Sequence, residues 1–233
     1  MNVNVFTLYP QAFPGYLALS NAGRAMEKGL WSLNTVDIRD YAQDRYRTVD
    51  DTPFGGGAGM VMRPDVVDRA LADKAAGQLV HLTPRGEVLN QGMARRLAQM
   101  PAISILCGHF EGIDQRVIDK WQPLEISVGD YVLSGGEIAA MVLLDCVVRL
   151  LPGVLGSEES LREESFNAGL LEYNQYTKPR IWNGASVPDV LANGNHALIG
   201  RFRLEQSQAT TKQRRPDLWR AYKTNQDQKD EGN

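Results

Sequence analysis

Short runs of apolar residues alternate with longer stretches of mixed polarity through the first two-thirds of the 233-residue chain. The apolar runs are nearly continuous instead of alternating with polar residues, which is typical of β-strands covered on both faces. We predict strands at residues 3–8, 35–38, 79–82, 103–107 and 124–128.

Three stretches between these runs carry apolar residues at helical spacing, at residues 64–74, 91–100 and 112–120. Pro64 suits the first turn of a helix, and Asp65 is favourable beside the positive end of the helix dipole. Strands that alternate with helices predict an α/β domain with a mostly parallel sheet.

A further segment, residues 138–151, is apolar nearly all round and carries only Asp145 and Arg149 as charges. A helix of this kind is buried, either in the core of one chain or between subunits. The segment presents more apolar surface than one small domain needs, so we predict an obligate homodimer.

The chain changes character after residue 156. Residues 157–165 are polar and acidic with little to bury, and they predict a mobile linker, which we place at residues 157–168. Between Arg201 and Lys223 there are seven basic residues against two acidic ones, although the whole chain has a net charge of −3. We therefore predict a first domain at residues 1–156 and a helical second domain at residues 169–233.

The amino-acid composition and the N-terminal sequence indicate which class of protein this chain belongs to. Hydrophobic residues make up 43% and charged residues 23%, which is ordinary for a globular protein. Two cysteines without C-x-x-C spacing argue against a disulfide framework. The N-terminus lacks a signal-peptide pattern, and residues 138–151 are too short and too charged to span a bilayer. We predict a cytoplasmic protein that does not bind membranes.

Three glycine-containing segments follow predicted strands, at residues 83–86, 108–112 and 129–137. Ligands of open α/β sheets bind beyond the carboxyl ends of the strands, and glycine lets the backbone approach them closely. We expect a ligand site here, the alternative being three tight strand–helix turns.

A fourth loop, residues 48–60, has four glycines within five positions. It matches neither a phosphate-binding loop nor the dinucleotide fingerprint, which disfavours a dinucleotide-dependent oxidoreductase. The loop either accepts a flat base against bare backbone or is a flexible surface loop.

The loops described above and several later motifs follow one another along the chain in this order: TVDD-P-GGG-GM, CG-EGID-R and S-GDY-LSGGE, then PGVLG, ESF-GLLE, QYT-P, GNH and RRP. Each motif is short, but the ordered set is specific, and from Phe6 to about Leu218 it resembles the bacterial tRNA (guanine-N1)-methyltransferases. The resemblance implies a SPOUT-type α/β domain with a trefoil knot, a homodimer and a helical C-terminal domain that binds tRNA. It also implies methylation by S-adenosylmethionine of N1 of the guanosine 3′-adjacent to the anticodon, tRNA position 37.

The same resemblance implies the residues of two binding sites. The methyl donor is expected at Leu82, Pro84, Gly108, Glu111, Gly112, Val128, Gly129, Asp130, Tyr131, Val132, Leu133, Gly135 and Gly136. The guanine is expected at Asp50, Ala58 and Gly59, where the family often has proline in place of Ala58.

Methylation at N1 needs a base, because this nitrogen carries a proton at neutral pH, and a donor for the negative charge that grows on O6. The resemblance implies Glu164 as the base, at a position where we expect aspartate in most members, with Glu163 as the next candidate. It implies Arg149 as the partner of O6. Without the resemblance, Glu164 would be a solvated charge and Arg149 would pair with Asp145 one turn earlier.

Four arginines of the basic cluster are expected to contact tRNA phosphates, namely Arg201, Arg203, Arg214 and Arg215, the alternative being a solvated helix face. Members of the family are described as magnesium-dependent, but no carboxylate cluster identifies a site, and we predict no metal ligand. Of the histidines, we expect His81 to be packed, His109 to face a ligand or lie in a surface turn, and His196 to cap or pack the following helix. A methyltransferase for another RNA or for a ribose hydroxyl, and a non-catalytic RNA-binding relative, remain as alternatives.

Overall fold

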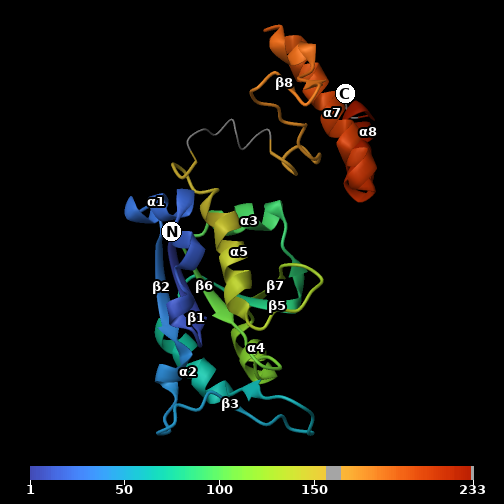
Figure 1. The fold of residues 1–233 in the computed structure, drawn as a ribbon. Coiled ribbons are helices and arrows are strands. Elements are labelled where there is room, and N and C mark those ends of the chain that lie inside the picture. Colours follow the sequence, from blue (N-terminus) through green and yellow to red (C-terminus); the bar gives the residue numbers. More distant parts are fainter. Residues whose placement is uncertain (156–163, 232–233) are drawn as a thin grey trace. The chain divides into compact units, whose positions relative to one another are not determined.

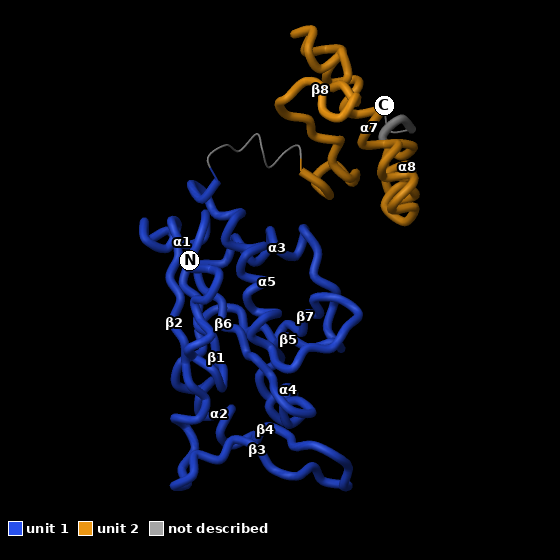
Figure 2. The backbone as a smooth tube through the Cα atoms, in the orientation of Figure 1, with its two compact units in different colours: residues 1–156 blue, residues 157–233 orange. Residues whose placement is uncertain are grey.

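The computed structural model describes residues 1–155 and 164–231, and the chain divides into two compact units (Figure 2). Unit 1 comprises residues 1–156 and unit 2 residues 157–233. Most of the expected linker, residues 157–163 with Glu163 among them, lies outside the described residues.

Unit 1 is built on a five-stranded sheet in the order β2-β1-β6-β5-β7, in which every neighbouring pair is parallel (Figure 1). Its strands are β1 (Asn2–Thr7), β2 (Ser32–Asp37), β5 (Gln78–Val88), β6 (Ala102–Cys107) and β7 (Leu124–Ser127). The predicted α/β class with a mostly parallel sheet is confirmed.

Helices cover both faces of this sheet. Side chains alternate along each strand, so Val5 and Ile105 belong to one apolar cluster, and Phe6 and Leu106 to the other. The first cluster is completed by α1 (Ser20–Glu27), α3 (Gln91–Ala98) and α5 (Gly136–Val148), and the second by α2 (Pro64–Lys74) and α4 (Gln115–Trp121). Unit 1 also has the short helices η1 (Pro10–Ala12), η2 (Gly15–Ala18) and η3 (Ile38–Tyr41), and a small antiparallel ladder of β3 (Asp50–Asp51) and β4 (Val61–Met62).

Most predicted elements of unit 1 lie within a few residues of their observed positions, and α2 matches at both ends. The strand expected at residues 35–38 begins earlier, at Ser32, because β2 is an edge strand in which only Val36 is fully buried. The helix expected from residue 112 begins at Gln115, since the Asp114 side chain caps it by accepting the N–H of Arg116. Sequence reasoning missed α1, which buries only small residues.

Strand β5 is longer than the predicted run at residues 79–82, because it resumes after an interruption. Leu82 and Glu87 both pair with Ile126 of β7, so residues 83–86 stand outside the ladder. At the end of this bulge a Cβ on Gly86 would lie 2.4 Å from the carbonyl carbon of Glu125. Only glycine fits there, and the tight approach fixes the bulge against β7.

Helix α5 is buried on one side only. Leu143, Leu144 and Val147 lie in the core, whereas Ile138 and Val142, one turn apart, are 62% and 41% exposed. The single chain therefore buries only one side of α5. Of the two predicted environments, the core of one chain and an interface between subunits, the core accounts for that side alone. None of the helices in the described parts of the chain is long and apolar enough to cross a membrane.

Unit 2 consists of a two-stranded hairpin, β8 (Ile181–Trp182) and β9 (Ala185–Ser186), followed by η4 (Asp189–Ala192), α7 (His196–Arg214) and α8 (Pro216–Glu231). Helix α7 is capped by Asn195, whose side chain accepts the N–H of Leu198. The prediction for His196 is wrong, because this side chain neither caps nor packs and lies exposed in the first turn.

Candidate active site

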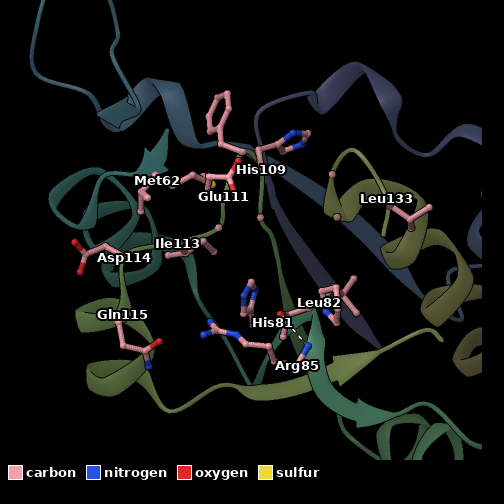
Figure 3. Close-up of a pocket in the computed structure, with 18 of the residues that line it drawn as sticks. Met62, His81, Leu82, Arg85, His109, Glu111, Ile113, Asp114, Gln115 and Leu133 are labelled. Atoms are coloured by element: carbon pink, nitrogen blue, oxygen red, sulfur yellow. Dashed lines mark hydrogen bonds between the residues drawn. The ribbon is translucent and has the colours of Figure 1, made fainter. Parts of the chain in front are cut away.

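A cavity of about 1100 Å³ lies beside the bulge of β5 and beyond the carboxyl ends of β6 and β7 (Figure 3). The three glycine-containing segments, at residues 83–86, 108–112 and 129–137, all contribute to its wall. Of the residues expected at the methyl donor, the cavity is lined by Leu82, Pro84, Gly108, Glu111, Gly112, Val128, Gly129, Tyr131, Val132, Leu133, Gly135 and Gly136. Asp130 is not among the lining residues.

Bare backbone forms part of the wall. A Cβ on Gly108 would lie 3.3 Å from the His81 ring, and one on Gly136 would lie 2.7 Å from the Cα of Cys107. The Gly136 N–H donates to the carbonyl of Gly108 at 3.0 Å, which ties the start of α5 to the end of β6. Side chains at these glycines would therefore displace the wall.

Side chains from different elements converge on the same space. Figure 3 shows His81 and Arg85 from β5, Glu111 from the loop after β6, and Leu133 from the loop before α5 around the cavity. Apolar side chains and approachable backbone suit a flat heteroaromatic ring, while a carboxylate and carbonyls suit a positive charge. The wall therefore offers a surface for a flat ring, with charged groups of both signs around it, among them Arg85 and Glu111.

A buried carboxylate braces the wall. Glu137, 8% exposed in the first turn of α5, accepts the Thr7 hydroxyl at 2.6 Å and lies 2.8 Å from Nε2 of His109. The ring of Tyr9 packs edge-on to that of His109, with centroids 5.0 Å apart. His109 thus lines the cavity from within a fixed network, and a Cβ on Gly135 would lie 2.1 Å from its ring.

The loop predicted to receive guanine is hydrogen-bonded to residues 111–112, which are predicted to bind the donor. Glu111 N–H donates to the carbonyl of Met60, and Met62 N–H to that of Gly112, both at 2.9 Å. A Cβ on Gly59 would lie 2.4 Å from Oε1 of Glu111, so this glycine permits the close approach. The glycine loop therefore lies beside the segment at residues 108–112.

The residues of this loop that line the cavity are not the ones we expected. Asp51, Thr52, Pro53 and Phe54 contribute to its wall, while Asp50, Ala58 and Gly59 do not. Asp50 is half-buried and pairs with Met62 in the β3–β4 ladder, and Ala58 is exposed. Sequence reasoning did not identify Phe54 as a lining residue. An aromatic side chain directly before three consecutive glycines is a signal that could have identified it.

The two residues expected to act in catalysis belong to different units. Arg149 is half-buried at the C-terminal end of α5 and does not line the cavity. Glu164 is half-buried at the start of the described part of unit 2, and its carbonyl accepts the N–H of Asn167. Their roles stay predictions.

The four arginines expected at tRNA differ in their surroundings. Arg201 and Arg214 are exposed. Arg203 lies over the ring of Tyr173, 4.5 Å from its centroid. Arg215 donates to Asp217, and this hydrogen bond lowers the pKa of Asp217 to about 2. Arg201 and Arg214 are thus the more accessible pair.

Residues 1–155 and 164–231 contain no group of three or more His, Cys, Asp or Glu side chains that could hold a metal ion.

The packing predicted for His81 is confirmed, and it makes stability depend on pH. The ring is 4% exposed, its Nδ1 lies 3.3 Å from the carbonyl oxygen of Leu106, and burial lowers its pKa. A lowered pKa in the folded state means that the unfolded chain takes up the proton first as pH falls below about 6.5. The stability held by the neutral ring is therefore present above that pH and lost below it.

We expect the free energy of unfolding to fall between pH 7.5 and pH 5.5, and to fall less steeply in His81→Gln. Urea unfolding at a series of pH values measures both slopes. His196→Gln is the control, because His196 is exposed and its replacement should leave the slope as in the wild type. Equal slopes in wild type and His81→Gln would contradict this account.

Comparison with known proteins supports the family resemblance along nearly the whole chain. The family described as tRNA (Guanine-1)-methyltransferase TrmD matches residues 1–221. The chain is 60% identical over 220 residues to the tRNA (guanine-N(1)-)-methyltransferase of Rhodospirillum rubrum, covering 94% of this chain and 92% of that protein. It is 56% identical over 222 residues to the protein of the same name from Brucella canis, covering 95% and 91%. The parallel sheet agrees with the SPOUT-type α/β fold that the resemblance implied, and the chain belongs to the tRNA (guanine-N1)-methyltransferase family.

Proposed function

We propose that this protein, acting in the cytosol as a homodimer, transfers a methyl group from S-adenosylmethionine to N1 of guanosine 37 in tRNA. The observation that carries the proposal is the cavity of about 1100 Å³, whose wall comes from three glycine-containing segments, in a chain of this family. Small-molecule sites typically occupy about 300–1,000 Å³, so this cavity has room for a donor and an incoming base.

The donor would be held by the lining residues of the three glycine-containing segments. Leu82, Val128 and Leu133 would pack against its adenosyl group, and the backbone around Gly108 and Gly136 would approach it without obstruction. When bound, S-adenosylmethionine supplies an electrophilic methyl group on a positively charged sulfur.

The guanine must leave its stacked position to reach the cavity, which costs least in a loop. We propose that the glycine loop binds the guanine, because Pro53 and Phe54 of this loop line the cavity. Asp50 lies in β3, where the loop begins. Glu164 would accept the proton of N1, so that the nitrogen lone pair becomes the nucleophile. Arg149 would stabilise the negative charge on O6 as the proton leaves.

Unit 2 would hold the tRNA. In this proposal the first domain spans residues 1–156, residues 157–168 link it to the second, and residues 169–233 bind RNA through Arg201, Arg203, Arg214 and Arg215. The exposure of Arg201 and Arg214 supports phosphate contacts there. The resemblance also implies a magnesium requirement, to which we assign no protein ligand. Adding EDTA to the activity assay tests it.

The homodimer is supported by the exposed side of α5. Ile138 and Val142 form an apolar stripe, and Val132 in the loop before α5 is 84% exposed. Surfaces of this kind are costly to leave in water and are typical of subunit interfaces. Light scattering at micromolar protein should give twice the mass of 25.9 kDa, and a monomeric mass would contradict the proposal.

The activity is tested with labelled S-adenosylmethionine and two tRNA transcripts that carry guanosine or adenosine just 3′ of the anticodon. We expect methylation of the guanosine transcript alone, with N1-methylguanosine as the product on nucleoside analysis. A 2′-O-methylated product would instead identify a ribose methyltransferase. No product from either transcript would refute the proposed substrate, and failure to bind S-adenosylmethionine in calorimetry would favour a non-catalytic RNA-binding protein.

A further inference from the structure

Unit 2 contains the β8–β9 hairpin, whose first strand is labelled in Figure 1. The hairpin exposes large apolar side chains. Every residue from 174 to 186 is exposed, including Tyr176 at 46%, Ile181 at 65% and Trp182 at 68%. Adjacent exposed residues of this size in a small unit mark a surface that another molecule covers.

The hairpin holds these side chains outward. Asn183 and Gly184 adopt positive φ values of 49° and 79°, as required by the tight two-residue turn that closes a hairpin. Trp182 pairs with Ala185, and Ile181 with Ser186, so each large side chain faces a small one across the ladder. The small partners cannot cover the indole, and it is left available for a flat partner.

The charge beside the indole is positive. Between Tyr173 and Pro188 the chain has Lys178 and Arg180 and no acidic residue, in a protein whose net charge is −3. Arg180 donates to Asp189 at 2.8 Å, but both side chains are largely exposed, and such pairs are weak. An aromatic ring flanked by cations complements a nucleotide, whose base stacks and whose phosphate is anionic.

We propose that this hairpin is an RNA contact in which Trp182 stacks on an unpaired base of the tRNA, with Lys178 and Arg180 beside its phosphates. The contact is separate from the basic residues of α7 and α8, and it rests on the proposed function in that tRNA is the partner. A second copy of this chain could also cover an apolar hairpin, but the positive charge of Lys178 and Arg180, offset only weakly by the exposed pair of Arg180 with Asp189, favours the polyanion.

The kinetic test compares full-length Trp182→Ala, Trp182→Phe and wild type. Trp182→Ala should raise the KM for tRNA about tenfold, equal to about 1.4 kcal/mol, with unchanged kcat and unchanged affinity for S-adenosylmethionine. Trp182→Phe keeps a stacking ring and should stay within about twofold of wild type. Leu19→Ala, which truncates an exposed apolar side chain of unit 1, is the matched control and should leave the KM unchanged.

A binding test separates the hairpin from the methylation itself. Tryptophan emission of the wild type should be quenched by tRNA or a single-stranded RNA oligonucleotide, and Trp182→Phe should lose that quenching. Lys178→Ala should reduce by about one the slope of log affinity against log salt concentration.

Three results would overturn the inference: an unchanged KM in Trp182→Ala, equal quenching by duplex RNA, or a monomeric Trp182→Ala whose tRNA affinity is unchanged. The last would identify a subunit contact instead. Because the fluorescence test needs no methyl transfer, an inactive wild type whose Trp182 is quenched by tRNA would refute the proposed function and leave this contact standing.

Discussion

Replacing Glu164 with glutamine should lower the rate of methyl transfer about 10²- to 10⁴-fold while leaving the binding of tRNA and donor unchanged. Glutamine has the shape of glutamate but cannot accept the N1 proton, so the guanine lone pair stays unavailable to the methyl group. The loss should appear in kcat, because the interaction matters when the proton moves and not when tRNA binds.

Single-turnover kinetics with saturating enzyme and labelled donor measure the chemical step directly. Glu164→Asp is the matched control: it restores the acid expected in most family members, shortens the reach by one methylene, and should retain most of the activity. Full activity in Glu164→Gln would show that the base lies elsewhere, with Asp50 and Glu163 as the next positions to replace.

The second large effect is expected from Gly136→Ala, which should weaken S-adenosylmethionine binding about 100-fold. The new Cβ would lie 2.7 Å from the Cα of Cys107 and 3.1 Å from the backbone nitrogen of Gly108, so the backbone on one side must move. Overpacking of this kind costs about 3 kcal/mol, and about 1.4 kcal/mol corresponds to a tenfold change in affinity. The Gly136–Gly108 hydrogen bond lies in the cavity wall, so the displacement falls on the donor site.

Calorimetric titration with S-adenosylmethionine measures this loss, and thermal unfolding shows whether the fold persists. Gly200→Ala is the control, since a Cβ on Gly200 in α7 meets nothing within 4 Å and alanine favours a helix. It should bind the donor normally and unfold at the same or a higher temperature. Normal donor affinity in Gly136→Ala would mean that this part of the wall is not the donor site.

The convergence of the three glycine-containing segments on one cavity could be predicted because their signal is local. Glycines directly after apolar strands predicted a ligand site at the sheet edge, and the family resemblance supplied the individual residues. The brace made by Thr7, Glu137 and His109 could not be predicted, because Thr7 and Glu137 are 130 positions apart and nothing in either neighbourhood indicates the other. Only the folded sheet brings β1 beneath the start of α5.

Local patterns also misled in identifiable ways. Thr83-Pro84-Arg85-Gly86 is typical of a turn that ends a strand, yet β5 resumes at Glu87, because pairing with β7 continues past the interruption. Asn195 and His196 are adjacent, and the helix start depends on which of them caps α7. The asparagine carboxamide reaches the N–H of Leu198, which leaves the histidine exposed. In the glycine loop, residues 51–54 line the cavity and lie before the glycines, whereas Asp50, Ala58 and Gly59 were implied for the guanine by the family resemblance and stay predictions.

The bulge in β5 limits how the chain can change in length. Leu82 and Glu87 both pair with Ile126, and Gly86 approaches the Glu125 backbone too closely for a Cβ, so a residue added or removed between them would disturb one of these contacts. The glycine loop has no such limit, because β3 and β4 close it with two pairs and Cβ atoms on Gly55, Gly56 and Gly57 would meet nothing within 4 Å. Insertions should therefore be tolerated better on the side proposed for the guanine than in the bulge beside the proposed donor site.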